Sequence, residues 1–108
     1  MHTIVLYDIP SSRIRLKVAN ACLDFGLDRT QYSVFEGELS AAHQARLMAR
    51  VKPLLEGVAG FVLLLPISAD DWARRMQVGE TLLPNPLAEY EEIAGGSGPT
   101  EPSESYPF

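Results

Sequence analysis

IVLYDIPSSRIRLKV, residues 4–18, contains the change of pattern that decides the fold. Residues 3–7 are an apolar, β-favouring run without a break, which is typical of a strand covered on both faces. The run stops at residues 8–12, where Pro10 and two serines indicate a loop. Ser12 is then the expected N-cap of the helix that follows.

Beyond the loop, the apolar residues recur at helical spacing. Charged and polar side chains, among them Arg13 and Lys17, fall on one side of the predicted helix. Gly26 is the expected C′ glycine that ends the helix. The opposite side is an apolar stripe that consists of Ile14, Val18, Ala21, Cys22 and Phe25.

The middle of the chain predicts a hairpin, a second helix and a third apolar strand. Residues 29–39, RTQYSVFEGEL, are too long for one average strand and indicate two short strands that meet near Ser33. Ser40 is a candidate N-cap for a second amphipathic helix, which Pro53 should kink or shorten. Residues 60–67, GFVLLLPI, form another continuous apolar strand.

The order of elements is β-α-β-β-α-β with one extra strand around residues 74–79, an α+β fold of the ferredoxin-like plan over residues 1–80. In that plan the fourth strand lies at an edge of the sheet, and an exposed apolar edge is an aggregation hazard. We therefore expect a homodimer in which the extra strand of one subunit lies alongside the fourth strand of the other. Trp72 is expected to anchor the extra strand against the sheet or to contact a partner.

The charge of this 108-residue chain is unevenly distributed. Residues 1–53 carry seven basic and five acidic side chains, whereas residues 54–108 carry two basic and nine acidic ones. A net charge of −5 argues against nucleic acid at first sight, but the basic front half is compatible with a local polyanion site. Residues 81–108 are a tail rich in Pro, Gly and Glu, in which residues 95–105 should be disordered. For residues 82–93, docking on the dimer or a partner and plain disorder both stay open.

The sequence favours neither a membrane protein nor a disulfide-bonded secreted protein. No apolar run reaches the roughly 18 residues that span a bilayer, and the first apolar segment is too short for a secretory signal. We therefore expect a cytoplasmic protein that binds no membrane. Cys22 is the only cysteine, so it is expected to be a small buried apolar residue rather than part of a disulfide or a zinc site.

Several short motifs occur together in a specific order and spacing. YDI closes the first strand, RIRLKV opens the first helix, FG ends it, QYSVFEG forms the middle hairpin, and VGE comes last. Over residues 3–80 this pattern resembles the CRISPR-associated protein 2 family, the small partner of the CRISPR integrase. The tail has no counterpart in the family pattern.

The resemblance implies a ferredoxin-like homodimer that bridges two integrase dimers. Such a dimer supports a fragment of foreign double-stranded DNA along its surface during spacer acquisition. Many members were first described as metal-dependent nucleases that act on RNA or DNA. Their activity is tied to the aspartate after the first strand, which is Asp8 in this sequence.

Asp8 is thus the candidate metal ligand and catalytic residue. Two copies at a dimer seam can share one hard cation such as Mg²⁺, which activates water for phosphodiester cleavage. The alternative is a structural carboxylate that accepts backbone N–H groups in the turn at residues 9–12. The loop reads Pro10-Ser11-Ser12 where relatives are often acidic, so candidate second carboxylates are missing.

Arg13, Arg15 and Lys17 are the candidate nucleic-acid-binding residues. They open the first helix, whose free N–H groups already favour phosphate. Contacts of this kind position a duplex without reading its sequence. The alternative is an ordinary solvated helix face.

Two functions of different classes follow. One is a scaffold for spacer acquisition that binds DNA by its backbone. The other is a Mg²⁺-dependent endoribonuclease or endodeoxyribonuclease that uses Asp8. A dimeric regulator of an unrelated partner is compatible with the fold alone.

Overall fold

The computed structural model describes residues 1–80 of the chain. The predictions made for the tail, residues 81–108, lie outside these described residues. The described elements, in chain order, are β1 (His2–Asp8), α1 (Ser12–Asp24), β2 (Asp28–Gln31), β3 (Val34–Glu38), α2 (Ala41–Val51), the 3-10 helix η1 (Lys52–Leu55), β4 (Phe61–Ile67) and α3 (Ala69–Ala73).

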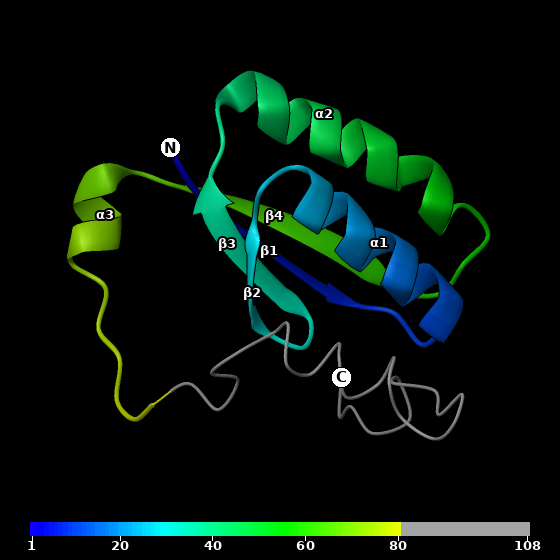
Figure 1. Ribbon diagram of the computed structural model, residues 1–108, viewed down its shortest axis with the longest axis horizontal. Helices are drawn as coiled ribbons and strands as arrows, with labels where there is room; N and C mark the ends of the chain where they lie inside the picture. Colours follow the sequence, from blue (N-terminus) through cyan, green and yellow to red (C-terminus); the bar gives the residue numbers. More distant parts are fainter. Residues whose placement is uncertain (81–108) are drawn as a thin grey trace.

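β1 lies inside a four-stranded antiparallel sheet with the strand order β2-β3-β1-β4. α1 and α2 lie side by side over one face of this sheet (Figure 1). The order of elements and the topology of the sheet are those of a ferredoxin-like α+β fold. The predicted fold class is therefore confirmed.

The core lies between the sheet and the two helices. Along β1, alternate side chains are buried, and Val5 is fully covered beside Phe35 of β3. Val18 of α1 and Leu47 of α2 fill the same layer from the other side. Burying apolar side chains of this size stabilises a fold by about 1.5–3 kcal/mol each. This covered face of the sheet is complete within the single chain.

The opposite face of the sheet is left open by α1 and α2, and the short helix α3 contacts only one end of it, through Trp72 stacked on His2. This open face contains three residues of β1 and their partners in β4: Ile4 beside Leu65, Leu6 beside Leu63, and Asp8 beside Phe61. The three β4 side chains are 39–49% exposed. The prediction that residues 3–7 are covered on both faces is thus wrong for the single chain, because both helices pack on the same side.

The ends of α1 are set by local hydrogen bonds. The N-cap is Ser11, one residue earlier than predicted, and its Oγ accepts from the Ile14 N–H at 3.3 Å. At the other end, Gly26 adopts φ +85°, and the Leu27 N–H donates to the Cys22 carbonyl at 3.1 Å. This hydrogen bond is typical of a C′ glycine, so the predicted helix end is confirmed.

The remaining boundaries follow the predicted turn and cap residues. β2 and β3 are separated by residues 32 and 33, as expected for two strands that meet near Ser33. Ser40 caps α2 by accepting from the His43 N–H at 3.1 Å. α2 stops at Val51, and Pro53 lies in the 3-10 helix that follows it. Among residues 1–80, no helix is long and apolar enough to cross a membrane.

The extra strand expected at residues 74–79 is not formed in the single chain. Ser68 caps the short helix α3 by accepting from the Asp71 N–H at 3.1 Å, and Asp70 and Asp71 favour the positive end of that helix. The residues after α3 then pair with no strand of the described chain. An extended segment becomes a strand only when a neighbour supplies ladder hydrogen bonds. The described sheet therefore has four strands.

Candidate nucleic-acid and metal site

Asp8 is the last residue of β1, and its side chain is exposed at one end of the open face. No hydrogen bond or ion pair between residues 1–80 uses its carboxylate. The alternative role, in which the carboxylate accepts N–H groups of the turn at residues 9–12, is not formed among the described residues, and the helix that follows is capped by Ser11. The Asp8 carboxylate is therefore available to a cation or a donor from outside the described residues.

The backbone at Asp8 is held from two sides. Gly60, directly ahead of β4, adopts φ +114°, and a Cβ there would overlap the Asp8 carbonyl oxygen and lie 2.9 Å from the Cα of Ile9. Only glycine permits so close an approach. From α1, Arg15 donates through Nη1 to the Ile9 carbonyl at 3.0 Å. These contacts fix the position of the strand end that carries Asp8.

A metal ion at Asp8 would have one protein carboxylate per chain. Within residues 1–80, no group of three or more His, Cys, Asp or Glu side chains is close enough to hold a metal ion. Mg²⁺ usually keeps several waters and binds through one or two carboxylates plus substrate phosphates. An exposed carboxylate without a partner fits one such ligand position, and further protein ligands have to come from a second copy.

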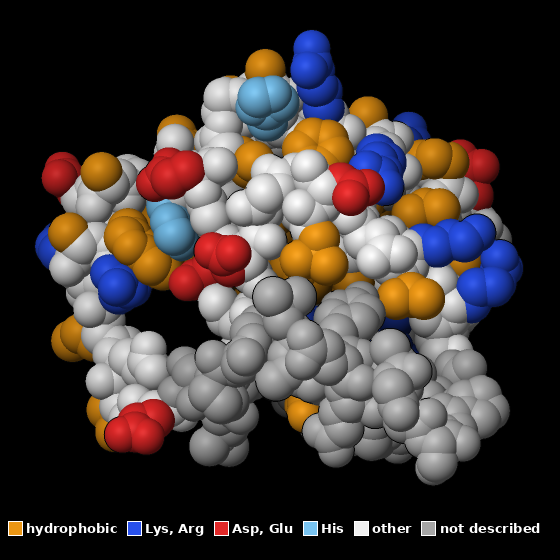
Figure 2. Space-filling view, in the orientation of Figure 1, with side chains coloured by type: hydrophobic (Ala, Val, Ile, Leu, Met, Phe, Trp, Pro, Cys, Tyr) orange, Lys and Arg blue, Asp and Glu red, His pale blue; other side chains and the backbone are white. Residues whose placement is uncertain are grey.

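The three candidate nucleic-acid-binding residues have different surroundings. Arg13 and Lys17 are exposed, and neither forms a hydrogen bond or ion pair within the described part of the chain. Arg15 is half-buried and bonded to the loop backbone. Lys and Arg side chains gather where α1 begins and α2 ends, with hydrophobic side chains between them (Figure 2). The structure thus brings Arg13 and Lys17 to the surface and turns Arg15 toward the loop after Asp8.

The N-terminus of α1 adds to the positive potential of this surface. Its first turn contains no acidic residue. The partial positive charge of the helix end is therefore not neutralised by its own sequence. An anion near Arg13 would interact with both the guanidinium and the helix end.

Cys22 lies in the core beneath α1 and is fully buried. Desolvation raises the pKa of its thiol from 9.0 to about 12, although the cations of Arg29 and Arg50 act in the opposite direction. A thiol with such a pKa is protonated and unreactive at neutral pH. The prediction that Cys22 is a buried apolar residue is confirmed.

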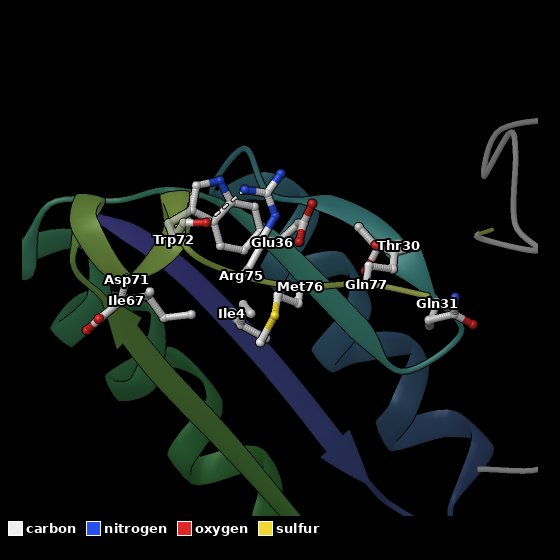
Figure 3. A pocket seen from close by; sticks show the side chains of 10 residues that line it. All are labelled: Ile4, Thr30, Gln31, Glu36, Ile67, Asp71, Trp72, Arg75, Met76 and Gln77. Carbon is white, nitrogen blue, oxygen red and sulfur yellow. Dashed lines mark hydrogen bonds between the residues drawn. The ribbon is translucent and has the colours of Figure 1, made fainter. Parts of the chain in front are cut away.

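A cleft of about 470 Å³ lies between one end of the open face and the residues that follow β4 (Figure 3). Trp72 of α3 lines it and stacks on His2 of β1, with ring centroids 3.4 Å apart. The guanidinium carbon of Arg75 lies 3.9 Å from the centroid of the same indole ring. Trp72 therefore anchors α3, rather than a strand, to the sheet.

Sequence reasoning missed two features of this region. Gly60 directly precedes an apolar run, and a glycine in that position is a signal for close backbone approach. Leu16 and Leu23 lie outside the apolar stripe of α1 and are 49% and 41% exposed. Their spacing of seven residues signals that they share one side of the helix.

Comparison with known proteins gives consistent matches. The family model described as CRISPR associated protein Cas2 matches residues 1–75. A Chloroflexus aurantiacus protein named CRISPR-associated endoribonuclease Cas2 2 is 43% identical over 75 residues, which are 69% of this chain and 88% of that protein. The CRISPR-associated endoribonuclease Cas2 of Desulforudis audaxviator is 37% identical over 71 residues, or 66% of this chain and 67% of the relative.

Solved structures show the same fold. A hypothetical protein from Thermus thermophilus is 30% identical and superimposes with a TM-score of 0.62, over 78% of this chain and 96% of that one. Streptococcus pyogenes Cas2 is 24% identical, with a TM-score of 0.60 over 73% of this chain and 100% of that one. At that identity the second match supports the fold alone.

Proposed function

The chain belongs to the CRISPR associated protein Cas2 family, and on that premise we propose that it is a dimeric scaffold for CRISPR spacer acquisition. In this function, the dimer bridges two integrase dimers and holds double-stranded DNA by its phosphate backbone. The observation that carries the proposal is the open face of the sheet, an apolar surface beside an unpaired edge strand.

The β4 side of the open face supports a dimer because it is apolar and only half covered. Phe61, Leu63 and Leu65 stand in a row along β4 and are 49%, 44% and 39% exposed. Rows of exposed apolar side chains of this kind mark interaction sites in soluble proteins. A second copy stacked on the same face would remove them from water and bring the two Asp8 residues toward a common seam.

A charge introduced into the open face tests the dimer. The variant Leu63→Lys/Leu65→Lys should elute as a folded monomer in size-exclusion chromatography with light scattering, whereas the wild type should be a dimer. Leu16→Lys on α1 is the control, because it places the same charge at an exposed leucine outside the open face. A double variant that stays dimeric at micromolar concentration would rule out this face as the interface.

The outward cations of α1 support binding of the DNA backbone. Arg13 and Lys17 are one turn apart on an exposed helix face and have no described partner to lose when they meet phosphate. Each phosphate contact lowers the slope of log affinity against log salt by about 0.9. Binding should therefore weaken steeply as salt is raised.

The decisive experiment is a spacer-acquisition assay in cells with the cognate integrase. Arg13→Glu/Lys17→Glu should abolish acquisition while the purified variant remains a dimer, and Asp8→Asn should leave acquisition intact. Arg46→Glu, a charge reversal on α2, controls for a general loss of positive charge. Normal acquisition by the α1 variant would refute DNA holding by this helix.

A second function, metal-dependent cleavage of RNA or DNA, is favoured by one specific observation. The Asp8 carboxylate is exposed and has no partner among the described residues, which is unusual for a carboxylate at the rim of an apolar surface. The relatives from Chloroflexus and Desulforudis bear the name endoribonuclease. In a dimer, the Asp8 carboxylates of both copies would hold Mg²⁺, which supplies an activated water when bound.

Cleavage by purified protein tests this second function. Wild-type protein with Mg²⁺ should degrade single-stranded RNA or duplex DNA, and Asp8→Asn should lower the activity by about 100-fold or more, because it removes the carboxylate that each copy would contribute to the metal. Asp24→Asn is the matched control, since Asp24 is an exposed aspartate already paired with Arg50. Cleavage that survives Asp8→Asn would point to a contaminating nuclease.

A further inference from the structure

One side of α1 is exposed along its whole length. Six exposed residues share this side at spacings of three and four: Arg13, Leu16, Lys17, Asn20, Leu23 and Asp24. At 100° per residue they cover an arc of about 120°, with the two leucines along one margin and the two cations along the other. Asp24 lies on the cation margin, at the C-terminal end of the helix, and is already paired with Arg50. We call the other five residues, Arg13, Leu16, Lys17, Asn20 and Leu23, the outer face of α1.

Nothing in the described chain occupies the outer face. Arg13 and Lys17 have no acidic partner among residues 1–80, in contrast to Arg50, which pairs with Asp24 at 2.8 Å. Leu16 and Leu23 keep 49% and 41% of their surface exposed, although the other apolar residues of α1 are buried. A row of leucines beside a row of cations is complementary to a segment that has apolar and acidic residues in alternation.

The chain itself contains such a segment. Residues 82–93, LLPNPLAEYEEI, combine four aliphatic side chains of Leu and Ile with three glutamates. Over residues 81–108 there are five glutamates and no lysine or arginine. This composition matches both rows of the outer face, the leucines by apolar contact and the cations by charge.

Covalent linkage makes weak docking sufficient. The segment begins two residues after Glu80, the last described residue. The glutamates of the segment lie about ten residues beyond Glu80. A flexible chain of about that length spans roughly 16–19 Å on average and over 30 Å when extended, and short tethers give effective concentrations in the millimolar range. A contact too weak to form between separate molecules is therefore populated within one chain.

We propose that residues 82–93 dock on the outer face of α1 of the same chain and compete there with nucleic-acid phosphate for Arg13 and Lys17. The inference rests on the proposed function, because it gives the DNA-binding helix an internal acidic competitor. DNA binds only the undocked form, so the apparent affinity falls in proportion to the fraction that is undocked. Salt weakens both interactions, since both depend on exposed charges.

The experiment uses the full chain and two sets of tail variants. Glu89→Gln/Glu91→Gln/Glu92→Gln removes the carboxylates of the proposed segment, and Glu101→Gln/Glu104→Gln is a control in the same tail. Leu16→Gln/Leu23→Gln removes the apolar row and leaves both cations in place. The readouts are affinity for a labelled DNA duplex at low salt and the amide NMR shifts of α1 without DNA.

If the segment docks, the triple glutamate variant and the double leucine variant should both bind the duplex about three- to tenfold more tightly than wild type, as expected when 70–90% of the chains are docked. The control variant should change affinity by less than twofold. The amides of Lys17, Asn20 and Leu23 should shift in the triple variant and stay unchanged in the control.

Two results would overturn the proposal. Identical α1 amide shifts in wild type and the triple variant would show that the segment does not dock, whatever the DNA affinities are. Shifts that vanish on dilution would show that the tail binds another molecule. Absence of DNA binding by every variant would refute the proposed function instead, and the amide shifts would still report on docking.

Discussion

The two faces of the sheet are made by the same strands but have different surroundings. On the covered face, Val5 and Phe35 are completely buried under the helices. On the open face, Leu63 and Phe61 remain 44% and 49% exposed. No charged side chain of the first 80 residues is buried on the covered face, whereas the open face combines its apolar row with Asp8 and with Glu36 and Glu38 of β3. The covered face stabilises the chain, and the open face, with Asp8 at its end, is available for assembly.

The largest effect should come from the centre of the covered face. Phe35→Ala should lower the free energy of unfolding by about 3–5 kcal/mol, because it leaves a cavity in a closed core. Leu63→Ala on the open face should cost less than about 1 kcal/mol in a monomer, since its side chain is already half in water. Urea denaturation of both variants measures the difference.

The dependence of these two stability losses on protein concentration gives a second test of the difference between the faces. If a second copy covers the open face, the cost of Leu63→Ala should rise with protein concentration, whereas that of Phe35→Ala should not. Equal costs for both variants at every concentration would contradict the distinction between the two faces.

The next largest loss of stability is expected at Gly60, directly ahead of β4, where the chain passes close to the backbone of Asp8. Gly60→Ala combines an unfavourable φ of +114° with an overlap on the Asp8 backbone, so it should destabilise by about 3 kcal/mol. Gly57→Ala is the matched control: it has φ +70° and nothing within 4 Å of the added Cβ, and should cost only about 1–2 kcal/mol. Thermal unfolding of the two variants measures which one loses more stability. Equal losses would show that the backbone at Asp8 shifts at little cost in free energy.

A smaller effect, the pH dependence of stability at Cys22, tests whether water reaches the core. Because burial raises the pKa of Cys22 from 9.0 to about 12, the unfolded chain loses the thiol proton first as the pH rises. The stabilisation is complete below about pH 9 and is lost toward pH 12, at about 1.4 kcal/mol per pH unit. Urea denaturation at pH 8 and pH 10 should show this loss in wild type beyond that of Cys22→Ala. An equal loss of stability between pH 8 and pH 10 in wild type and Cys22→Ala would mean that water reaches the thiol.

The smallest effect belongs to the solvent side of the helices. The ion pair of Asp24 and Arg50 spans 2.8 Å, but its side chains are 61% and 45% exposed. Asp24→Asn should therefore change the free energy of unfolding by less than about 1 kcal/mol. The change should vanish in 0.5 M salt if it comes from the ion pair, and a salt-independent change would assign it to the end of α1.

The sequence predicts the elements well because each has a local signal. The strand, loop and helix of residues 4–18 follow from apolar periodicity and from Gly26 at the helix end. The N-cap is displaced by one residue because two adjacent serines offer the same side chain, and only hydrogen-bond geometry chooses Ser11. The strand expected at residues 74–79 is missing because a strand needs a partner, which periodicity alone cannot supply.

The sequence predicts which residues form the candidate site but not which contacts they make. The position of Asp8 at a strand end and of Arg13, Arg15 and Lys17 at a helix start follows from the chain order. The contact of Gly60 with the Asp8 backbone joins residues far apart in sequence, and no local pattern predicts it. Arg13 and Arg15 lie about 200° apart around the helix, so periodicity separates their sides. It does not show that Arg15 bonds to the Ile9 carbonyl, which depends on how the loop after Asp8 folds.

The stack formed by His2, Trp72 and Arg75 gives the protein a built-in optical reporter. Trp72 is the only tryptophan of the chain, and it lies at the joint between the sheet and the residues that lead toward the tail. Indole emission depends on the groups in contact with the ring, so separation of α3 from β1 changes its colour and intensity. Intrinsic fluorescence can therefore follow motion of this joint in unlabelled protein.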